Sequence, residues 1–150
     1  MEHILVDGYN ILHQWPEFER ARRSSLAKAR QALINLLTQF HDCHGGKMTL
    51  VFDGRSTSRG DPSLHTNIAV IYSRQGESAD AVIERIVAHS AKPGDFLVAT
   101  DDQIQRSTVE SFGARVTSAD MFHILVESEL DNLGQALDQI TSKNRSFGKR

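Results

Sequence analysis

Cysteine is nearly absent from this chain of 150 residues, which contains only Cys43. A single cysteine cannot form an intramolecular disulfide, so a disulfide-stapled fold is excluded and a reducing compartment is indicated. No apolar run approaches the roughly 20 residues that a membrane-spanning helix requires. The N-terminus also lacks a basic segment followed by a signal-like apolar stretch. We therefore expect a soluble cytoplasmic protein with no membrane partner.

The chain has little excess charge of either sign. Its 17 Lys and Arg nearly balance 19 Asp and Glu, which leaves a net charge of −2. Six arginines nevertheless lie near or between the acidic positions discussed below: Arg20, Arg22, Arg23, Arg55, Arg59 and Arg74. An acidic centre with a basic rim would suit RNA binding, because the rim can hold phosphates. Solvated surface charge is the competing explanation for any one of these arginines.

Short apolar runs alternate with helical patterns along the chain. We expect strands at residues 3–7, 48–53, 68–72, 96–99 and 114–116. We expect helices at residues 9–15, from Ser24 or Ser25 to the Gly45-Gly46 pair, from Ser78, from Asp101 or Asp102, and from Ser118. In the last helix, Leu130, Leu133, Leu137 and Ile140 are expected to face inward. This alternation predicts an α/β domain over residues 1–142, with a mostly parallel sheet covered on both faces, and a disordered basic tail over residues 143–150.

Acidic residues stand at the ends of three predicted strands and at the start of one helix. Asp7 and Asp53 each end an apolar run, Asp102 follows another, and Asp80 opens an amphipathic helix. The carboxyl ends of parallel strands share one edge of the sheet, where ligands bind. Two carboxylates roughly 4 Å apart repel by about 4 kcal/mol at an effective dielectric constant of about 20. A hard divalent cation relieves this repulsion, so the pattern predicts a metal site.

Helix capping is the competing explanation for part of this set, because aspartate is a favoured N-cap residue. Capping is a stronger explanation for Asp101 than for Asp80, and it has little weight for Asp7. Asn10 shares the first strand–helix junction with Asp7 and is expected to point into the same crevice.

Several other functions are excluded by spacing. The chain has neither G-x-x-x-x-G-K-[ST] nor G-x-G-x-x-G, which would cradle phosphates, and no G-x-S-x-G elbow of a serine hydrolase. An aspartyl phosphatase would typically carry a second acid two residues after its nucleophile, but Tyr9 follows Asp7 and Arg55 follows Asp53 at that spacing. The segment of residues 41–44 (HDCH) has too few ligands, with no second cluster, for a convincing zinc site.

Four segments together resemble the YacP-like branch of the NYN domain, within the PIN-like superfamily of metal-dependent nucleases. They are residues 4–10 (ILVDGYN), 51–53 (VFD), 77–80 (ESAD) with Ile83-Glu84, and 98–102 (VATDD). The resemblance covers roughly residues 3–130 and is specific as a combination, since each segment alone is weak. It implies a three-layer PIN-like fold and an endoribonuclease that uses Mg²⁺ or Mn²⁺.

Position by position, the resemblance implies that Asp7, Asp80 and Asp102 hold metal, with support from Asp53 and Glu77, and that Asn10 orients a ligand. Relatives often carry a single Asp after the Ala-Thr pair, so the doubled Asp101-Asp102 leaves open which residue faces the metal; we favour Asp102. The hypothesis is hydrolysis of RNA by a metal-activated water, with Arg20, Arg23, Arg55, Arg59 and Arg74 as candidates to bind the flanking phosphates.

Two alternatives remain. A non-catalytic module, either RNA-binding or ribosome-associated, could retain a residual acidic pocket, and the translation machinery is a candidate partner. The complete acidic set argues against it, because a pocket released from catalysis has no reason to keep its mutual repulsion. A phosphoacceptor receiver domain would usually need a lysine at a late strand end, and residues 115–118 (RVTS) supply none.

Overall fold

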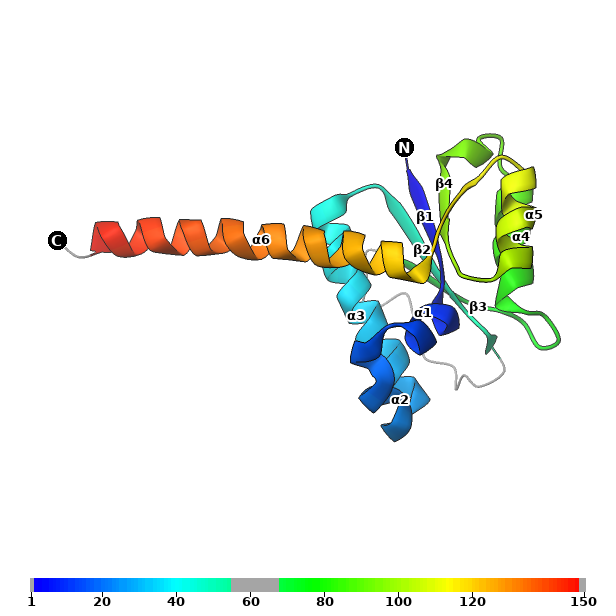
Figure 1. The fold of residues 1–150 in the computed structure, drawn as a ribbon, viewed down its shortest axis with the longest axis horizontal. Helices are drawn as coiled ribbons and strands as arrows, with labels where there is room; N and C mark the ends of the chain where they lie inside the picture. The colour runs from blue at the N-terminus through cyan, green and yellow to red at the C-terminus, as the bar shows by residue number, and fades with distance from the viewer. Residues whose placement is uncertain (1, 55–67, 149–150) are drawn as a thin grey trace.

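A five-stranded parallel sheet forms the centre of the structure, a computed structural model that describes residues 2–54 and 68–148 (Figure 1). The strands are β1 (His3–Asp7), β2 (Lys47–Phe52), β3 (Ala69–Tyr72), β4 (Phe96–Ala99) and β5 (Arg115–Thr117), in the order β3-β2-β1-β4-β5. Every neighbouring pair is parallel. The chain moves outward from β1 through β2 to β3, and then returns to the other side of β1 at β4. Such a reversal leaves a crevice at the carboxyl ends of the two central strands.

Helices connect the strands and cover both faces of the sheet. They are α1 (Gly8–Gln14), α2 (Glu19–Ser24), α3 (Leu26–His44), α4 (Ala79–Ala88), α5 (Gln103–Ser111) and α6 (Ala119–Gly148), with short 3-10 turns η1 (Pro16–Phe18) and η4 (Pro93–Asp95). Ser25 caps α3 and Ser78 caps α4, because each hydroxyl accepts a backbone N–H three residues on. The predicted α/β class with a covered parallel sheet is thereby confirmed. Helix α2, a short helix with no buried residue, was not expected.

Alternating side chains of the strands divide the core into two layers. On one face, Ile4 and Val6 of β1 pack with helices α1, α3 and α6 through residues such as Leu37 and Phe122. On the other face, Leu5 packs with α4 and α5. This alternation follows from the period of two in a strand, and it produces the three-layer arrangement of helices, sheet and helices.

Gly8 allows α1 to begin directly at the end of β1. A Cβ atom at this position would overlap the aromatic ring of Phe52 and lie 3.0 Å from the carbonyl oxygen of Val51. A larger residue would therefore push α1 away from β2. The close approach holds Asp7, the residue before Gly8, at the edge of the sheet.

Helix α6 departs from two expectations. It projects well beyond the sheet (Figure 1), so Leu133, Leu137 and Ile140 are 41%, 53% and 56% exposed rather than facing inward. It also continues as helix to Gly148, past residue 142, where the sequence suggested that the domain ends. No proline interrupts the segment, and helix formation continues past the point where the core ends. None of the described helices is long and apolar enough to cross a membrane.

Candidate active site

Three carboxylates meet at the carboxyl edge of the sheet. Asp7 ends β1, Asp102 follows β4, which neighbours β1, and Asp80 lies in the first turn of α4. The three carboxylates lie close enough to interact: the negative charges of Asp80 and Asp102 raise the pKa of Asp7, and that of Asp102 raises the pKa of Asp80. The structure thus brings together the three acids that the sequence places at separate junctions.

Asp7 is the most buried of the three, with 9% of its surface exposed. Burial raises the pKa of its carboxyl from 3.8 to about 7, and the negative charges of Asp80 and Asp102 add to the effect. The backbone N–H of Asn10 opposes the shift; it lies near the carboxylate but makes no capping hydrogen bond with it. A buried carboxyl that is costly to ionise is a site where a cation would be strongly stabilising.

Asp80 and Glu84 extend the acidic cluster along one face of α4. Burial raises the pKa of Asp80, as do the charge of Asp102 and a proton that the two carboxyls can share. The pKa of Glu84 is raised as well, by burial first and then by the charges of Asp80 and Asp102. Glu84 lies one helical turn from Asp80 and is a fourth acid that we had not included in the expected site.

Asp101 and Asp102 point to different partners. The Asp101 carboxylate accepts the backbone N–H of Ala119 at 2.9 Å, at the start of α6. One oxygen of Asp102 caps α5 by accepting the N–H groups of Ile104 at 2.9 Å and Gln105 at 3.1 Å. Its negative charge acts on Asp7 and Asp80, whereas that of Asp101 is not among the causes of their shifts. Asp102 is therefore the better placed of the pair to share a cation.

Asn10 holds the loop after β4. Its side-chain oxygen accepts the backbone N–H of Asp101 at 3.1 Å, which ties α1 to the segment that carries Asp102. Thr100, which is fully buried, accepts the backbone N–H of Asp102 at 3.2 Å through its hydroxyl. These two hydrogen bonds fix where Asp102 lies relative to Asp7.

Two further acids that we expected to support the metal do not contribute to these pKa shifts. Glu77 pairs with the guanidinium of Arg85, which lowers the pKa of Glu77, and it accepts the backbone N–H of Arg74 at 3.4 Å. Asp53 follows β2 at the same edge of the sheet and is half-buried. Neither residue is among the causes of the pKa shifts of Asp7 and Asp80.

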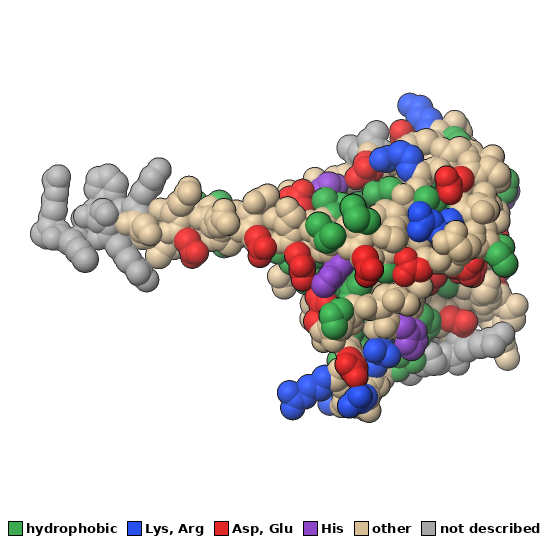
Figure 2. All heavy atoms as spheres, viewed as in Figure 1, with side chains coloured by type: hydrophobic (Ala, Val, Ile, Leu, Met, Phe, Trp, Pro, Cys, Tyr) green, Lys and Arg blue, Asp and Glu red, His purple; other side chains and the backbone are tan. Residues whose placement is uncertain are grey.

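The arginines expected to bind RNA are dispersed. Arg20 and Arg23 lie on α2, where they line a shallow hollow with Pro16 and Glu19, and Arg23 pairs with Glu19 at 2.7 Å. Figure 2 shows lysine and arginine side chains over α2, at the lower end of the view, below the end of β1 in Figure 1. Arg74 is exposed in the loop after β3. Arg55 and Arg59 lie outside the described residues.

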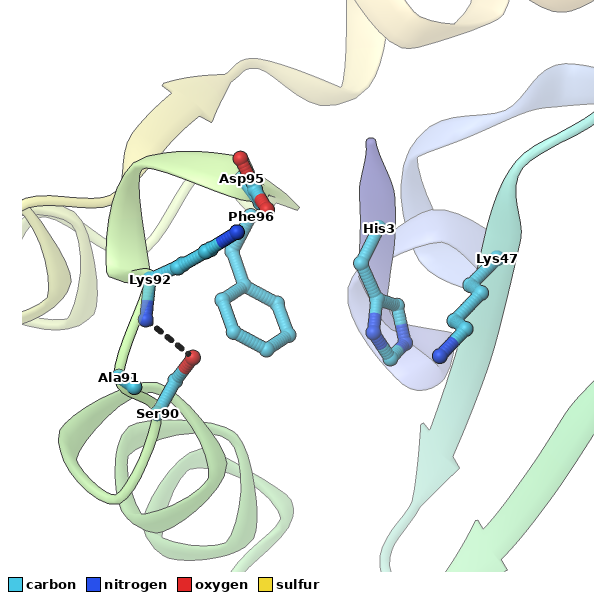
Figure 3. Close-up of a pocket in the computed structure, with 7 residues that line it drawn as sticks. All are labelled: His3, Lys47, Ser90, Ala91, Lys92, Asp95 and Phe96. Carbon is cyan, nitrogen blue, oxygen red and sulfur yellow. Dashed lines mark hydrogen bonds between the residues drawn. The ribbon is translucent and has the colours of Figure 1, made fainter. Parts of the chain in front are cut away.

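A separate hollow of about 550 Å³ lies at the opposite edge of the sheet. His3, Lys47 and Phe96, at the starts of β1, β2 and β4, line it together with Lys92 and Asp95 (Figure 3). Because it sits at the amino ends of the strands, it is remote from Asp7 and Asp102.

Gln105 is a buried amide beside the acidic cluster. The residue is 1% exposed, and neither its side-chain oxygen nor its nitrogen has a hydrogen-bond partner among the described residues. Its amide comes close enough to Asp80 to lower the pKa of that carboxyl, without ordinary hydrogen-bond geometry. A water bound to a cation between the carboxylates would satisfy a buried amide of this kind. No feature of the sequence around Gln105 predicts that its side chain is buried beside the acidic cluster.

Residues 4–150 match the family model of the YacP-like NYN domain. The chain belongs to the YacP-like NYN family. It is 29% identical over 146 residues to a protein of Bacillus subtilis (strain 168) named "Uncharacterized protein YacP", a match that covers 95% of this chain and 85% of the relative. The crystal structure of Rae1 (YacP) from Bacillus subtilis has a TM-score of 0.82 at 28% identity, with coverage of 97% of this chain and 85% of that one.

A second crystal structure, of a point mutant of the Bacillus subtilis protein, has a TM-score of 0.80 at 28% identity and covers 95% of this chain and 85% of its own. Both the resemblance read from the sequence and the fold it implied are thereby confirmed. Membership of the YacP-like NYN family is consistent with a nuclease of the RNase type. NYN and PIN-like nucleases generally use divalent metals.

Proposed function

We propose that this YacP-like NYN domain is an endoribonuclease that hydrolyses RNA phosphodiester bonds with Mg²⁺ or Mn²⁺ held by Asp7, Asp80 and Asp102. The observation that carries the proposal is the convergence of these three carboxylates on one edge of the sheet, with Asp7 buried and its pKa raised to about 7. Within the described residues, no lysine or arginine forms an ion pair with any of the three. Among the described residues, no lysine or arginine thus compensates the negative charge of the cluster, which a divalent cation would neutralise.

Each acid has a distinct part in the proposed site. Asp7 provides a buried ligand at the floor, and Asp80 provides a half-buried ligand from α4. Asp102 has one oxygen committed to the cap of α5, so its second oxygen is the one available to a cation or to a water bound to it. Glu84 joins the expected set as an outer acid. We do not include Asp101 among the proposed metal ligands, because its carboxylate accepts the backbone N–H of Ala119 at the start of α6.

When bound, a divalent cation at such a site activates a water for attack and stabilises charge on the leaving oxygen. The protein residues provide the positioning. Asn10 and Thr100 fix the loop that carries Asp102. Arg20 and Arg23 on α2, and Arg74 after β3, are our candidates to bind phosphates on either side of the cleaved bond. No protein nucleophile is needed, and none is assigned.

Cleavage assays with the full chain test this function. A labelled RNA of mixed sequence and the matching single-stranded DNA are incubated with the protein in Mg²⁺, in Mn²⁺ and in EDTA. We expect internal cleavage of the RNA in the presence of metal and none in EDTA. RNA binding of equal affinity in metal and in EDTA, without cleavage, would instead support the non-catalytic RNA-binding module.

A further inference from the structure

Three side chains of metal-ligand type meet at the surface, on elements that do not carry Asp7, Asp80 or Asp102. They are Glu17 in η1 and His123 and Glu127 in α6, and one ligand atom from each lies within 4.8 Å of the others. The Nε2 atom of His123 is 2.8 Å and 3.0 Å from the two carboxylate oxygens of Glu17. The same Nε2 atom is 3.3 Å from a carboxylate oxygen of Glu127. Both carboxylates therefore approach one ring nitrogen.

This convergence exceeds what an imidazole alone can satisfy. A histidine Nε2 has a single N–H, so it donates along one direction and cannot serve two carboxylates equally well. Within residues 2–54 and 68–142, neither Glu17 nor Glu127 forms an ion pair with lysine or arginine. A cation in place of the Nε2 proton would bind the nitrogen lone pair and one oxygen from each carboxylate at the same time.

Buried packing positions the His123 ring and the backbone that leads into Glu17. The His123 ring lies against the indole of Trp15, with 4.5 Å between ring centroids. Trp15 is 1% exposed, and its Nε1 donates to the carbonyl oxygen of Ala119 at 2.9 Å, which holds the segment before η1 against the first turn of α6. Pro16 restricts the backbone just before Glu17. Ligands held on two such elements are preorganised, as metal binding requires.

The geometry points to a site for a divalent transition metal of the zinc type at Glu17, His123 and Glu127. Imidazole nitrogen favours Zn²⁺, Ni²⁺ and Cu²⁺ over Mg²⁺ and Ca²⁺, and two carboxylates supply the negative charge. Three protein ligands leave a fourth position open to water, as in zinc sites that are not closed. The ion connects η1 to α6 and so links the end of α1 to the last helix. This site is independent of the proposed nuclease activity.

Zinc binding to the full chain, measured by isothermal titration calorimetry, tests the site. Every protein in the comparison carries Asp80→Asn, which weakens the acidic cluster as a competing site. In this background we expect Zn²⁺ to bind and to raise the melting temperature, and Mg²⁺ at the same concentration not to displace it. Adding Glu127→Gln should weaken Zn²⁺ binding at least tenfold. The exposed Glu127 side chain holds no other element, so this variant should fold.

Glu110→Gln is the matched control, because Glu110 is an exposed glutamate of α5 and the same chemical change there should leave Zn²⁺ affinity unaltered. His123→Gln provides a second ligand variant and should remove the zinc-induced rise in melting temperature. Absence of Zn²⁺ binding, or equal affinity in the Glu127→Gln and Glu110→Gln proteins, would overturn the proposal and leave His123 as a hydrogen-bond partner of the two glutamates.

Discussion

Replacing Asp7 with asparagine should stabilise the metal-free protein at neutral and alkaline pH, although it removes a proposed metal ligand. In the folded chain the pKa of Asp7 is about 7, because of burial and the charges of Asp80 and Asp102, against an ordinary value of 3.8. Between these two values the folded state binds a proton that the unfolded state has lost. The free energy of unfolding therefore falls as the pH rises from about 4 to about 7.

The size of the effect follows from the difference between the two pKa values of Asp7. Each unit of pKa corresponds to about 1.4 kcal/mol, so the ionised Asp7 costs at most about 4 kcal/mol of stability above pH 7. That is a large fraction of the 5–15 kcal/mol typical of a folded domain. The asparagine side chain of the variant cannot ionise, and its amide retains an oxygen that can face the backbone N–H of Asn10. The wild-type protein should regain the lost stability when Mn²⁺ is added, and the variant should gain less.

Urea unfolding followed by circular dichroism, in EDTA at pH 5 and at pH 8.5, measures this difference. We expect Asp7→Asn to exceed the wild-type protein in unfolding free energy by a few kcal/mol at pH 8.5, and the gap to narrow at pH 5. Asp138→Asn, an exposed position on the projecting part of α6, is the control and should match the wild type at both pH values. A variant that is no more stable than the wild type at pH 8.5 would refute the reasoning about the acidic cluster.

Two other predictions concern residues with measurable structural roles. Ser caps a helix as well as Asp does, so Asp102→Ser should keep the stability of the protein and lose RNA cleavage, whereas Asp102→Ala should also lose about 1 kcal/mol in urea unfolding. Cleavage that survives in the serine variant would remove Asp102 from the site. Burial lowers the pKa of His44, but its hydrogen bonds at 3.1 Å to Glu129 and to Glu2 outweigh this and raise it. The stabilisation of the folded state by protonated His44 is therefore present below the ordinary pKa of 6.5 and is lost as the pH rises through the pKa of His44 in the folded state. His44→Gln should thus lower the melting temperature more at pH 6 than at pH 9. Equal losses at the two pH values would contradict the ion pairs.

The acids at strand ends were predictable because sheet topology alone determines where they lie. Once the chain is read as a parallel sheet, Asp7 and the Asp101-Asp102 pair must share an edge with the start of α4. Which residue of the pair faces the cluster was not decided by the sequence. It depends on the start of α6, whose first N–H group is held by Asp101.

Other errors arose where tertiary contacts override local pattern. Leucines at helical spacing in α6 were expected to face inward. Only the first turns of this helix pack against the core, so the later leucines at the same spacing are exposed to solvent. The resemblance implied that Glu77 supports the metal, and local sequence did not reveal that Arg85, in the second turn of α4, pairs with it. Local sequence could not reveal the orphaned amide of Gln105, because its burial comes from neighbours distant in the chain.

Cleavage of RNA by Asp80→Asn, compared with the wild type and with Asp138→Asn, tests the proposed metal-dependent nuclease most directly. The three proteins are matched by circular dichroism and assayed in saturating Mn²⁺ with the protein in excess over a labelled RNA. We expect the Asp138→Asn protein to cleave at the wild-type rate. The Asp80→Asn rate should fall by at least the ~10–100-fold that loss of even an outer-shell partner of a metal site typically costs. A folded Asp80→Asn protein that cleaves RNA at the wild-type rate would contradict the assignment of the acidic cluster as the active site.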